Sequence, residues 1–272
     1  MHLKNKTIIV TGGGNGLGRE LVLNLLGKGN NVIAFDINEV ALEETGKLIP
    51  DNLRKCFATL KLDITDLQAV KDSVEKSIAF FGQVDCIINN AGIIQPFIKI
   101  IDTDFSIMKK VYEINFGGTM YMIKAYLPYL LERPDAHIVN ISSMGGFLPV
   151  PGQAIYGASK AAVKILTECL SSELSETSVK VTLVIPGAIF TNIKSNSGLS
   201  DKDGKNASDY KKIPRGTTSP VRAAEQITKG IEDNKVRVLI GTDSKIMHFL
   251  YQRAPGFASR LIYKKMKQHH NL

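Results

Sequence analysis

The sequence predicts a doubly wound α/β fold built on a parallel sheet of about seven strands. Short runs rich in Val and Ile alternate along the chain with longer amphipathic runs, and this alternation is typical of repeated βα units. The short runs lack strict apolar–polar alternation, which indicates strands covered by helices on both faces. No long linker interrupts the pattern, so we expect the 272 residues to form a single domain.

Each expected element can be placed in order. The strands are expected at residues 7–10, 31–36, 55–62, 84–88, 136–140, 180–185 and 236–240. The helices are expected at residues 16–28, 38–48, 66–80, 103–130, 153–176 and 221–233. Asn38 and Asp66 open two of these helices with side chains that favour the N-cap position.

One segment, 192–220, is rich in Ser, Asn, Asp, Lys and Gly and follows the sixth strand. Ligands of such sheets bind beyond the carboxyl ends of the strands, so this segment is expected to form a loop over the substrate. An ordinary surface insertion is the alternative.

Positive charge is concentrated near the C-terminus. The formal net charge is +8, and from residue 211 onward 13 Lys and Arg stand against 4 Asp and Glu. The segment contains no recognised nucleic-acid-binding module and the chain has no Trp, so we expect no nucleic-acid partner.

The cysteines and the apolar runs of the sequence indicate the cellular compartment of the protein. The three cysteines lie far apart without a C-x-x-C pair, so neither a disulfide framework nor a metal site is expected. The apolar run at the N-terminus is too short for a signal peptide, and the longest uncharged stretch, 136–159, contains four Gly and two Pro. We therefore expect a soluble, cytoplasmic protein.

A glycine-rich turn follows the first strand, where residues 11–18 read TGGGNGLG. Glycines let the backbone turn tightly and bring the amides of a helix N-terminus to a pyrophosphate. The turn is not a Walker P-loop, because Arg19-Glu20 stands where Lys-Ser/Thr would be required. A kinase or ATPase is therefore not expected, and a plain strand–helix turn is the alternative.

An acidic residue, Asp36, ends the second expected strand, 20 residues after Gly16. A carboxylate there can accept hydrogen bonds from both ribose hydroxyls of an adenosine. It would also repel a 2′-phosphate, and neither Ile37 nor Asn15 supplies a cation to offset that repulsion, so NAD(H) is expected over NADP(H). The alternative is a capping Asp before Asn38.

Tyr156 and Lys160 lie one turn apart on an expected helix, where a cation would favour the phenolate and lower the pKa of the phenol. Tyr263 and Lys267 repeat the spacing, so the pattern alone is weak. However, Ser143 precedes Tyr156 by thirteen residues, whereas Leu250 stands at that distance before Tyr263. The adjacent Ser142 is the alternative hydroxyl.

Together these motifs resemble the single-domain short-chain dehydrogenases/reductases, with a Rossmann-type, NAD(P)-binding fold, over residues 5–193. The resemblance rests on the following features: the turn at 11–18, Asp36, Asp63, NNAG at 89–92, Asn115, Ser143, Tyr156 with Lys160, and Pro186-Gly187 with Thr191.

The resemblance implies an oxidoreductase that transfers hydride between a nicotinamide cofactor and an alcohol or ketone. It implies that Tyr156 is the acid–base, that Ser143 polarises the substrate oxygen, that Lys160 binds the nicotinamide ribose, and that Asn115 holds a water that relays protons. The cofactor-binding positions that it implies are Gly12, Asn15, Gly16, Leu17, Gly18, Asp36, Asp63, Ile64, Asn90, Ala91, Gly92, Tyr156, Lys160, Pro186, Ile189 and Thr191. A homodimer or homotetramer is also expected.

The sequence also bears on two other function classes. A serine hydrolase is disfavoured because the chain has no G-x-S-x-G. A dinucleotide-sensing regulator with little turnover remains an alternative, although such a protein is expected to lack part of the set formed by Asn115, Ser143, Tyr156 and Lys160.

The substrate itself is not specified by a motif. Residues 147–150 (FLPV) predict an apolar wall, so an apolar secondary alcohol or ketone is expected.

A basic C-terminal extension, 242–272, continues past the seventh expected strand. Pro255-Gly256 divides it, and Phe257, Leu261, Ile262 and Met266 are expected to form one apolar stripe on a helix. We expect this stripe to pack against protein, near the mouth of the active site or at a subunit interface, and the neighbouring cations to face solvent. A membrane-surface helix is the alternative.

Overall fold

The computed structural model describes residues 1–191, 193, 197, 199 and 216–269. It contains the expected seven-stranded parallel sheet, with the strand order β3-β2-β1-β4-β5-β6-β7. The strands are β1 (Thr7–Thr11), β2 (Asn31–Asp36), β3 (Phe57–Lys61), β4 (Cys86–Asn89), β5 (Ala136–Ile141), β6 (Val179–Pro186) and β7 (Arg237–Ile240). All seven predicted strands are therefore confirmed, with ends that differ by a few residues.

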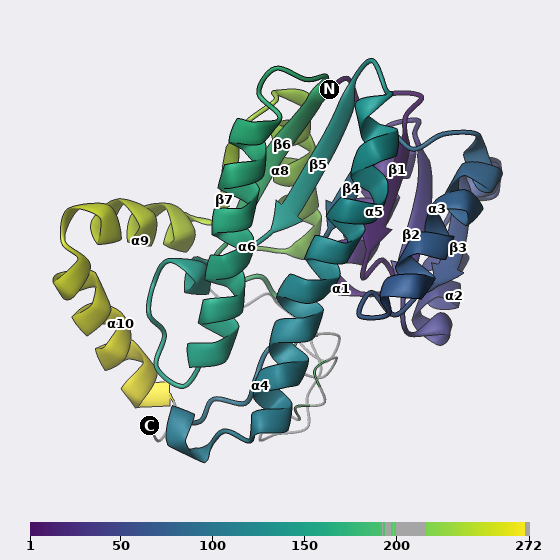
Figure 1. Ribbon diagram of the computed structural model, residues 1–272. Coiled ribbons are helices and arrows are strands. Elements are labelled where there is room, and N and C mark those ends of the chain that lie inside the picture. The colour runs from purple at the N-terminus through teal and green to yellow at the C-terminus, as the bar shows by residue number, and fades with distance from the viewer. Residues whose placement is uncertain (192, 194–196, 198, 200–215, 270–272) are drawn as a thin grey trace.

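Helices cover both faces of the sheet (Figure 1). One face packs on α1 (Gly16–Gly27), α2 (Glu39–Lys47) and α8 (Pro220–Glu232). The other face packs on α3 (Leu67–Phe81), α5 (Thr119–Leu131) and α6 (Ala154–Glu173). Successive strand residues alternate between the two cores, as Ile8 and Ile9 do, which explains why the strands read as continuous apolar runs.

The predicted N-caps are confirmed. Asn38 accepts a hydrogen bond from the Ala41 amide, and Asp66 accepts hydrogen bonds from the amides of Gln68 and Ala69. These side chains satisfy amides that the first turn of a helix leaves without a partner.

The helix predicted at 103–130 is divided in the structure. It consists of α4 (Phe105–Tyr112), a π-helical turn over Glu113–Gly118, and α5. Such turns insert an extra residue into the helix and occur often at functional sites. The inserted turn contains Asn115, which is completely buried.

The C-terminal extension forms two helices, α9 (Thr242–Arg253) and α10 (Pro255–His269), which project from the side of the domain where β7 lies (Figure 1). Only part of the predicted apolar stripe packs within this single chain. Ile262 and Met266 pack on the domain as expected, but Phe257 and Leu261 are exposed, and the small Ala258 takes the buried position instead. No helix among the described residues is long and apolar enough to cross a bilayer.

The β1–α1 turn brings backbone into unusually close contact with backbone. Gly12 has a φ of 68°, and a Cβ added at Gly18 would lie 1.9 Å from the Gly12 carbonyl oxygen. Only a glycine at position 18 therefore allows α1 to start so near the end of β1.

We predict that Gly18→Ala lowers the free energy of unfolding by about 1–3 kcal/mol, because the added methyl group forces the turn and α1 apart. Urea unfolding would measure the change. Gly27→Ala, in the same helix, is the matched control because nothing lies within 4 Å of its added Cβ. The control should be neutral or stabilising by up to about 1 kcal/mol, and an equal loss in both variants would contradict the argument.

Candidate active site

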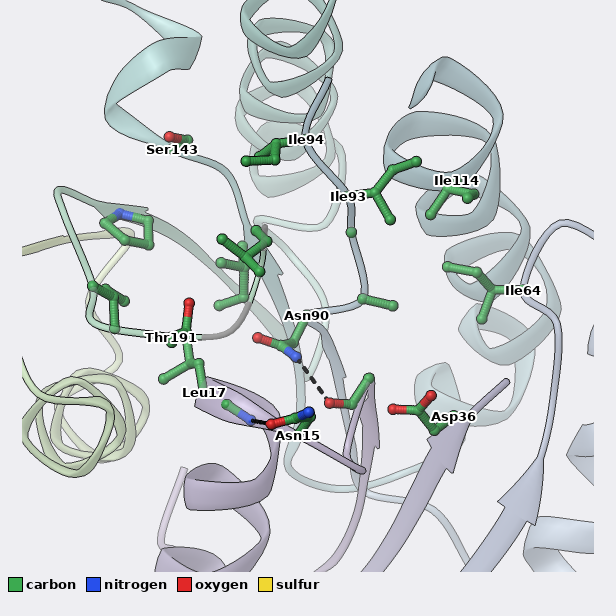
Figure 2. Close-up of a pocket in the computed structure, with 18 of the residues that line it drawn as sticks. Asn15, Leu17, Asp36, Ile64, Asn90, Ile93, Ile94, Ile114, Ser143 and Thr191 are labelled. Carbon is green, nitrogen blue, oxygen red and sulfur yellow. Dashed lines mark hydrogen bonds between the residues drawn. The ribbon is translucent and has the colours of Figure 1, made fainter. Parts of the chain in front are cut away.

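A cavity of about 540 Å³ opens at the carboxyl edge of the sheet, and residues at or just after the ends of the strands β1 to β6 line it (Figure 2). The predicted site residues that line it are Gly12, Asn15, Gly16, Leu17, Asp36, Asp63, Ile64, Asn90, Ala91, Gly92, Ser143, Tyr156, Lys160, Pro186, Ile189 and Thr191. Two predicted residues do not: Gly18 lies behind the turn against Gly12, and Asn115 is buried behind Gly92. Asp36 and Ser143 lie at opposite ends of the cavity in Figure 2.

The N-terminus of α1 forms the floor at the Asp36 end. Gly16 has a φ of 52°, and its amide donates to the side chain of Asn15, which caps the helix. Asn90 holds the turn in place, because its side-chain amide donates to the Thr11 carbonyl at 2.9 Å. A helix N-terminus presents unpaired amides and a partial positive charge, so this floor suits a phosphate group.

Asp36 is oriented by two backbone amides. One carboxylate oxygen accepts from Gly14 at 3.0 Å and the other accepts from Asn38 at 3.0 Å. The nearby guanidinium of Arg19 points to the Gly14 carbonyl and to the Glu44 carboxylate, 2.7 and 3.0 Å away. The positive charge of Arg19 is thus paired with the carboxylate of Glu44.

Tyr156 and Lys160 extend from the first turns of α6 into the other end of the cavity. Lys160 is buried, its ammonium donates to the Ile141 carbonyl at 2.9 Å, and burial lowers its pKa to about 8. Burial also raises the pKa of Tyr156, and a hydrogen bond with the Ser143 side chain opposes that rise. The expected lowering of the Tyr156 pKa by Lys160 is therefore not seen; desolvation of the phenol outweighs the other effects.

The two adjacent serines have different partners. Ser142 is buried and donates to the Lys160 carbonyl at 2.7 Å, which ties β5 to α6. Ser143 instead accepts from the Gly145 amide and hydrogen-bonds to Tyr156. Only Ser143 is thus brought to the phenol.

Asn115 connects the segment after β4 to α6, on the side of Lys160 away from the cavity. Its side chain accepts from the Ile93 amide and donates to the Ile93 carbonyl and to the Ser159 hydroxyl, at 2.8, 3.0 and 3.0 Å. A Cβ at Gly92 would lie 3.0 Å from the Asn115 oxygen and 3.1 Å from the Lys160 nitrogen. Asn115 and Lys160 therefore converge on Gly92, and an added side chain there would require one or both of them to shift.

One residue of the site was missed by the sequence analysis. Gln95 is completely buried, and its side-chain oxygen accepts from the amides of Ile155 and Tyr156 at 2.8 and 2.9 Å. It therefore caps α6, whose own N-cap residue, Gln153, makes no side-chain cap hydrogen bond. No local signal could reveal this contact, because Gln is not a typical cap residue and its partners lie about 60 residues away.

The apolar wall was assigned to the wrong residues. Residues 147–150 do not line the cavity; Leu148 is buried against α10, and Phe147 packs against His248 and Tyr251. The apolar lining consists mainly of isoleucines, at positions 37, 64, 93, 94, 114, 141, 189 and 193. Much of the predicted loop 192–220 lies outside the described residues.

Comparisons with known proteins agree with this geometry. The model of the short chain dehydrogenase family matches residues 6–202. A putative oxidoreductase, SadH, of Mycobacterium tuberculosis is 32% identical over 262 residues, which cover 95% of this chain and 94% of that protein. Dehydrogenase/reductase SDR family member 7B of Rattus norvegicus is 34% identical over 272 residues, covering 97% of this chain and 81% of that protein.

Two solved structures share the fold. A short chain dehydrogenase/reductase from Burkholderia phymatum in complex with NAD has a TM-score of 0.79 and 22% identity, covering 93% of this chain and 96% of that one. A short chain dehydrogenase from Burkholderia cenocepacia in complex with NADP has the same TM-score and identity, covering 96% of this chain and 99% of that one. The match over residues 6–202 and the relatives spanning nearly the whole chain establish that this protein belongs to the short-chain dehydrogenase/reductase family of nicotinamide-dependent oxidoreductases.

Proposed function

We propose that the protein is an NAD(H)-dependent oxidoreductase that interconverts an apolar secondary alcohol and its ketone, with Tyr156 as the general acid–base. The observation that carries the proposal is the position of Tyr156, Ser143 and Lys160 at one end of a cavity whose other end contains Asp36. Ile94, which lies beside Ser143 in Figure 2, favours an apolar substrate at that end of the cavity.

The residues fit a nicotinamide dinucleotide along this cavity. The α1 N-terminus would hold the pyrophosphate, Asp36 the adenosine ribose, and Lys160 the nicotinamide ribose. Asp63 and Ile64 would flank the adenine, and Pro186, Ile189 and Thr191 would contact the nicotinamide. When bound, the nicotinamide ring would give or take the hydride.

The chain itself would supply the proton chemistry. Ser143 would hydrogen-bond the substrate oxygen and hold it beside the Tyr156 hydroxyl, which would give a proton to the oxygen of a ketone or take one from an alcohol. With a pKa of about 8, Lys160 keeps most of its positive charge at neutral pH and would favour the phenolate during proton loss. Asn115 would help to hold a water molecule that relays protons from Lys160 to solvent.

Tyr156→Phe should lower kcat by about 10²–10⁴-fold while the Kd for dinucleotide changes little, because only the transferable proton is removed. The change in nicotinamide absorbance during turnover of a panel of secondary alcohols and ketones would measure kcat. Fluorescence titration with NADH would measure the Kd. Tyr263→Phe is the matched control, since it repeats the Tyr-x-x-x-Lys spacing on exposed α10 and should keep full activity. Retention of more than about a tenth of kcat in Tyr156→Phe would refute the assignment.

NADH should bind at least about tenfold more tightly than NADPH, because a phosphate beside the Asp36 carboxylate is disfavoured by more than about 1.4 kcal/mol. Asp36→Ala should narrow this difference by improving NADPH binding, as titration calorimetry would show. Asp63→Asn is the control: it removes a carboxylate that lines the same cavity, and should leave the ratio of the two Kd values unchanged. Equal affinity of the wild type for the two cofactors would contradict the proposal.

Gln95→Leu should lower kcat by about tenfold or more, because loss of the cap lets the first turn of α6 and Tyr156 shift. The Kd for NADH should stay constant, since Gln95 does not line the cavity. Gln153→Leu is the matched control: Gln153 is also buried, but its side chain donates to the carbonyls of Gln95, Pro96 and Gly152 and caps no helix. If Gln95→Leu keeps the kcat of the wild type at a temperature where the variant is folded, Gln95 has no positioning role.

A further inference from the structure

The two C-terminal helices have one face that packs on the domain and one that does not. On the inner face, Ala258, Ile262 and Met266 of α10 form a cluster with Leu148 and with Met247, Leu250 and Tyr251, of which the last three belong to α9. This cluster anchors the helix pair to the segment that follows Ser143 in the chain. The position of the pair is therefore set without any contribution from its outer face.

The outer face carries large apolar side chains. Phe249 on α9 is 61% exposed and Phe257 on α10 is 54% exposed. Ile246, Leu261 and Tyr263 are exposed as well. Exposed apolar residues gathered on adjacent helices, unlike scattered ones, mark an interaction surface.

The same face is positively charged throughout. After Asp243 the chain contains no Asp or Glu, whereas Lys245, Arg253, Arg260, Lys264, Lys265 and Lys267 all follow it. These six side chains are exposed, and the Arg253 guanidinium lies over the Phe249 ring, 5.2 Å from its centre. Any partner of the outer face must therefore accept apolar side chains and supply negative charge together.

We propose that the outer face of α9 and α10, defined by these five apolar and six basic residues, binds the surface of an anionic lipid bilayer. Apolar side chains of an interfacial helix enter the boundary of the acyl chains while Lys and Arg meet the lipid phosphates. The helices project from the domain (Figure 1), so a flat surface can reach them.

Charge complementarity favours this partner over a second copy of the chain. Residues 1–243 carry 28 Lys and Arg against all 26 Asp and Glu of the protein, so another copy offers no excess of negative charge to the six cations. The proposal does not depend on the reaction that the cavity performs, and a catalytically silent protein would bind in the same way.

Sedimentation of the 272-residue protein with vesicles tests the proposal. We expect binding to vesicles of phosphatidylcholine with phosphatidylglycerol, little binding to pure phosphatidylcholine, and release as salt is raised. Phe249→Ser/Phe257→Ser should reduce the partition coefficient by about tenfold or more, because both rings leave the lipid. Lys264→Gln/Lys265→Gln/Lys267→Gln should abolish the preference for the anionic lipid.

Val40→Ser/Phe80→Ser is the matched control. These residues are 63% and 45% exposed on α2 and α3, at the opposite end of the sheet. This control should bind vesicles as the wild type does, and circular dichroism should show that all variants are folded.

Three results would overturn the proposal. One is a wild type that stays in the supernatant with anionic vesicles at low salt. Another is equal vesicle binding by the two double variants. The third combines two observations: the wild type does not bind vesicles, and the Phe249→Ser/Phe257→Ser variant forms a smaller oligomer than the wild type in lipid-free buffer. This result would identify the outer face as a contact between copies of the chain.

Discussion

Parallel pairing of all seven strands places their carboxyl ends on one edge of the sheet, and the site is built along that edge. The strand order reverses beside β1, so the turns after β1 and β4 diverge to opposite faces and leave a crevice between them. The cavity lies there because no connecting helix covers that point. The glycine turn, Asp36, Asn90 and Ser143 occupy the cavity because each follows a strand that ends on this edge.

A layer of buried hydrogen bonds lies behind the end of the cavity that contains Tyr156 and Lys160. Gln95 caps α6, Asn115 ties the π-helical turn to Ile93 and Ser159, and Ser142 ties β5 to Lys160. Each of these side chains is buried, where an unmet hydrogen bond costs more than it would in water. The network thus restricts α6 to one position. Because Tyr156 and Lys160 lie on α6, their positions are fixed as well.

The two faces of the C-terminal helices have different surroundings. Their inner face completes the packing over residues 147–150, which the sequence analysis had assigned to the substrate. Their outer face leaves bulky apolar residues and cations exposed. Ala258 is the reason for this arrangement: its small side chain lets α10 approach Leu148 closely, which turns Phe257 and Leu261 away from the domain.

The sequence by itself determined the seven strands, the glycine turn, the caps at Asn38 and Asp66, and the group of residues that lines the cavity. The strands, the turn and the caps follow from periodicity and from the residues at strand and helix ends, which a linear sequence records directly. Most of the cavity residues were implied only by the resemblance to the short-chain dehydrogenases/reductases. Tertiary structure alone decided the cap by Gln95, the π-helical turn at Asn115, the place of Gly18 behind the turn and the inner face of α10. Each of these features depends on which distant backbone or side-chain groups pack against the residue. Those neighbours come together only when the whole chain has folded.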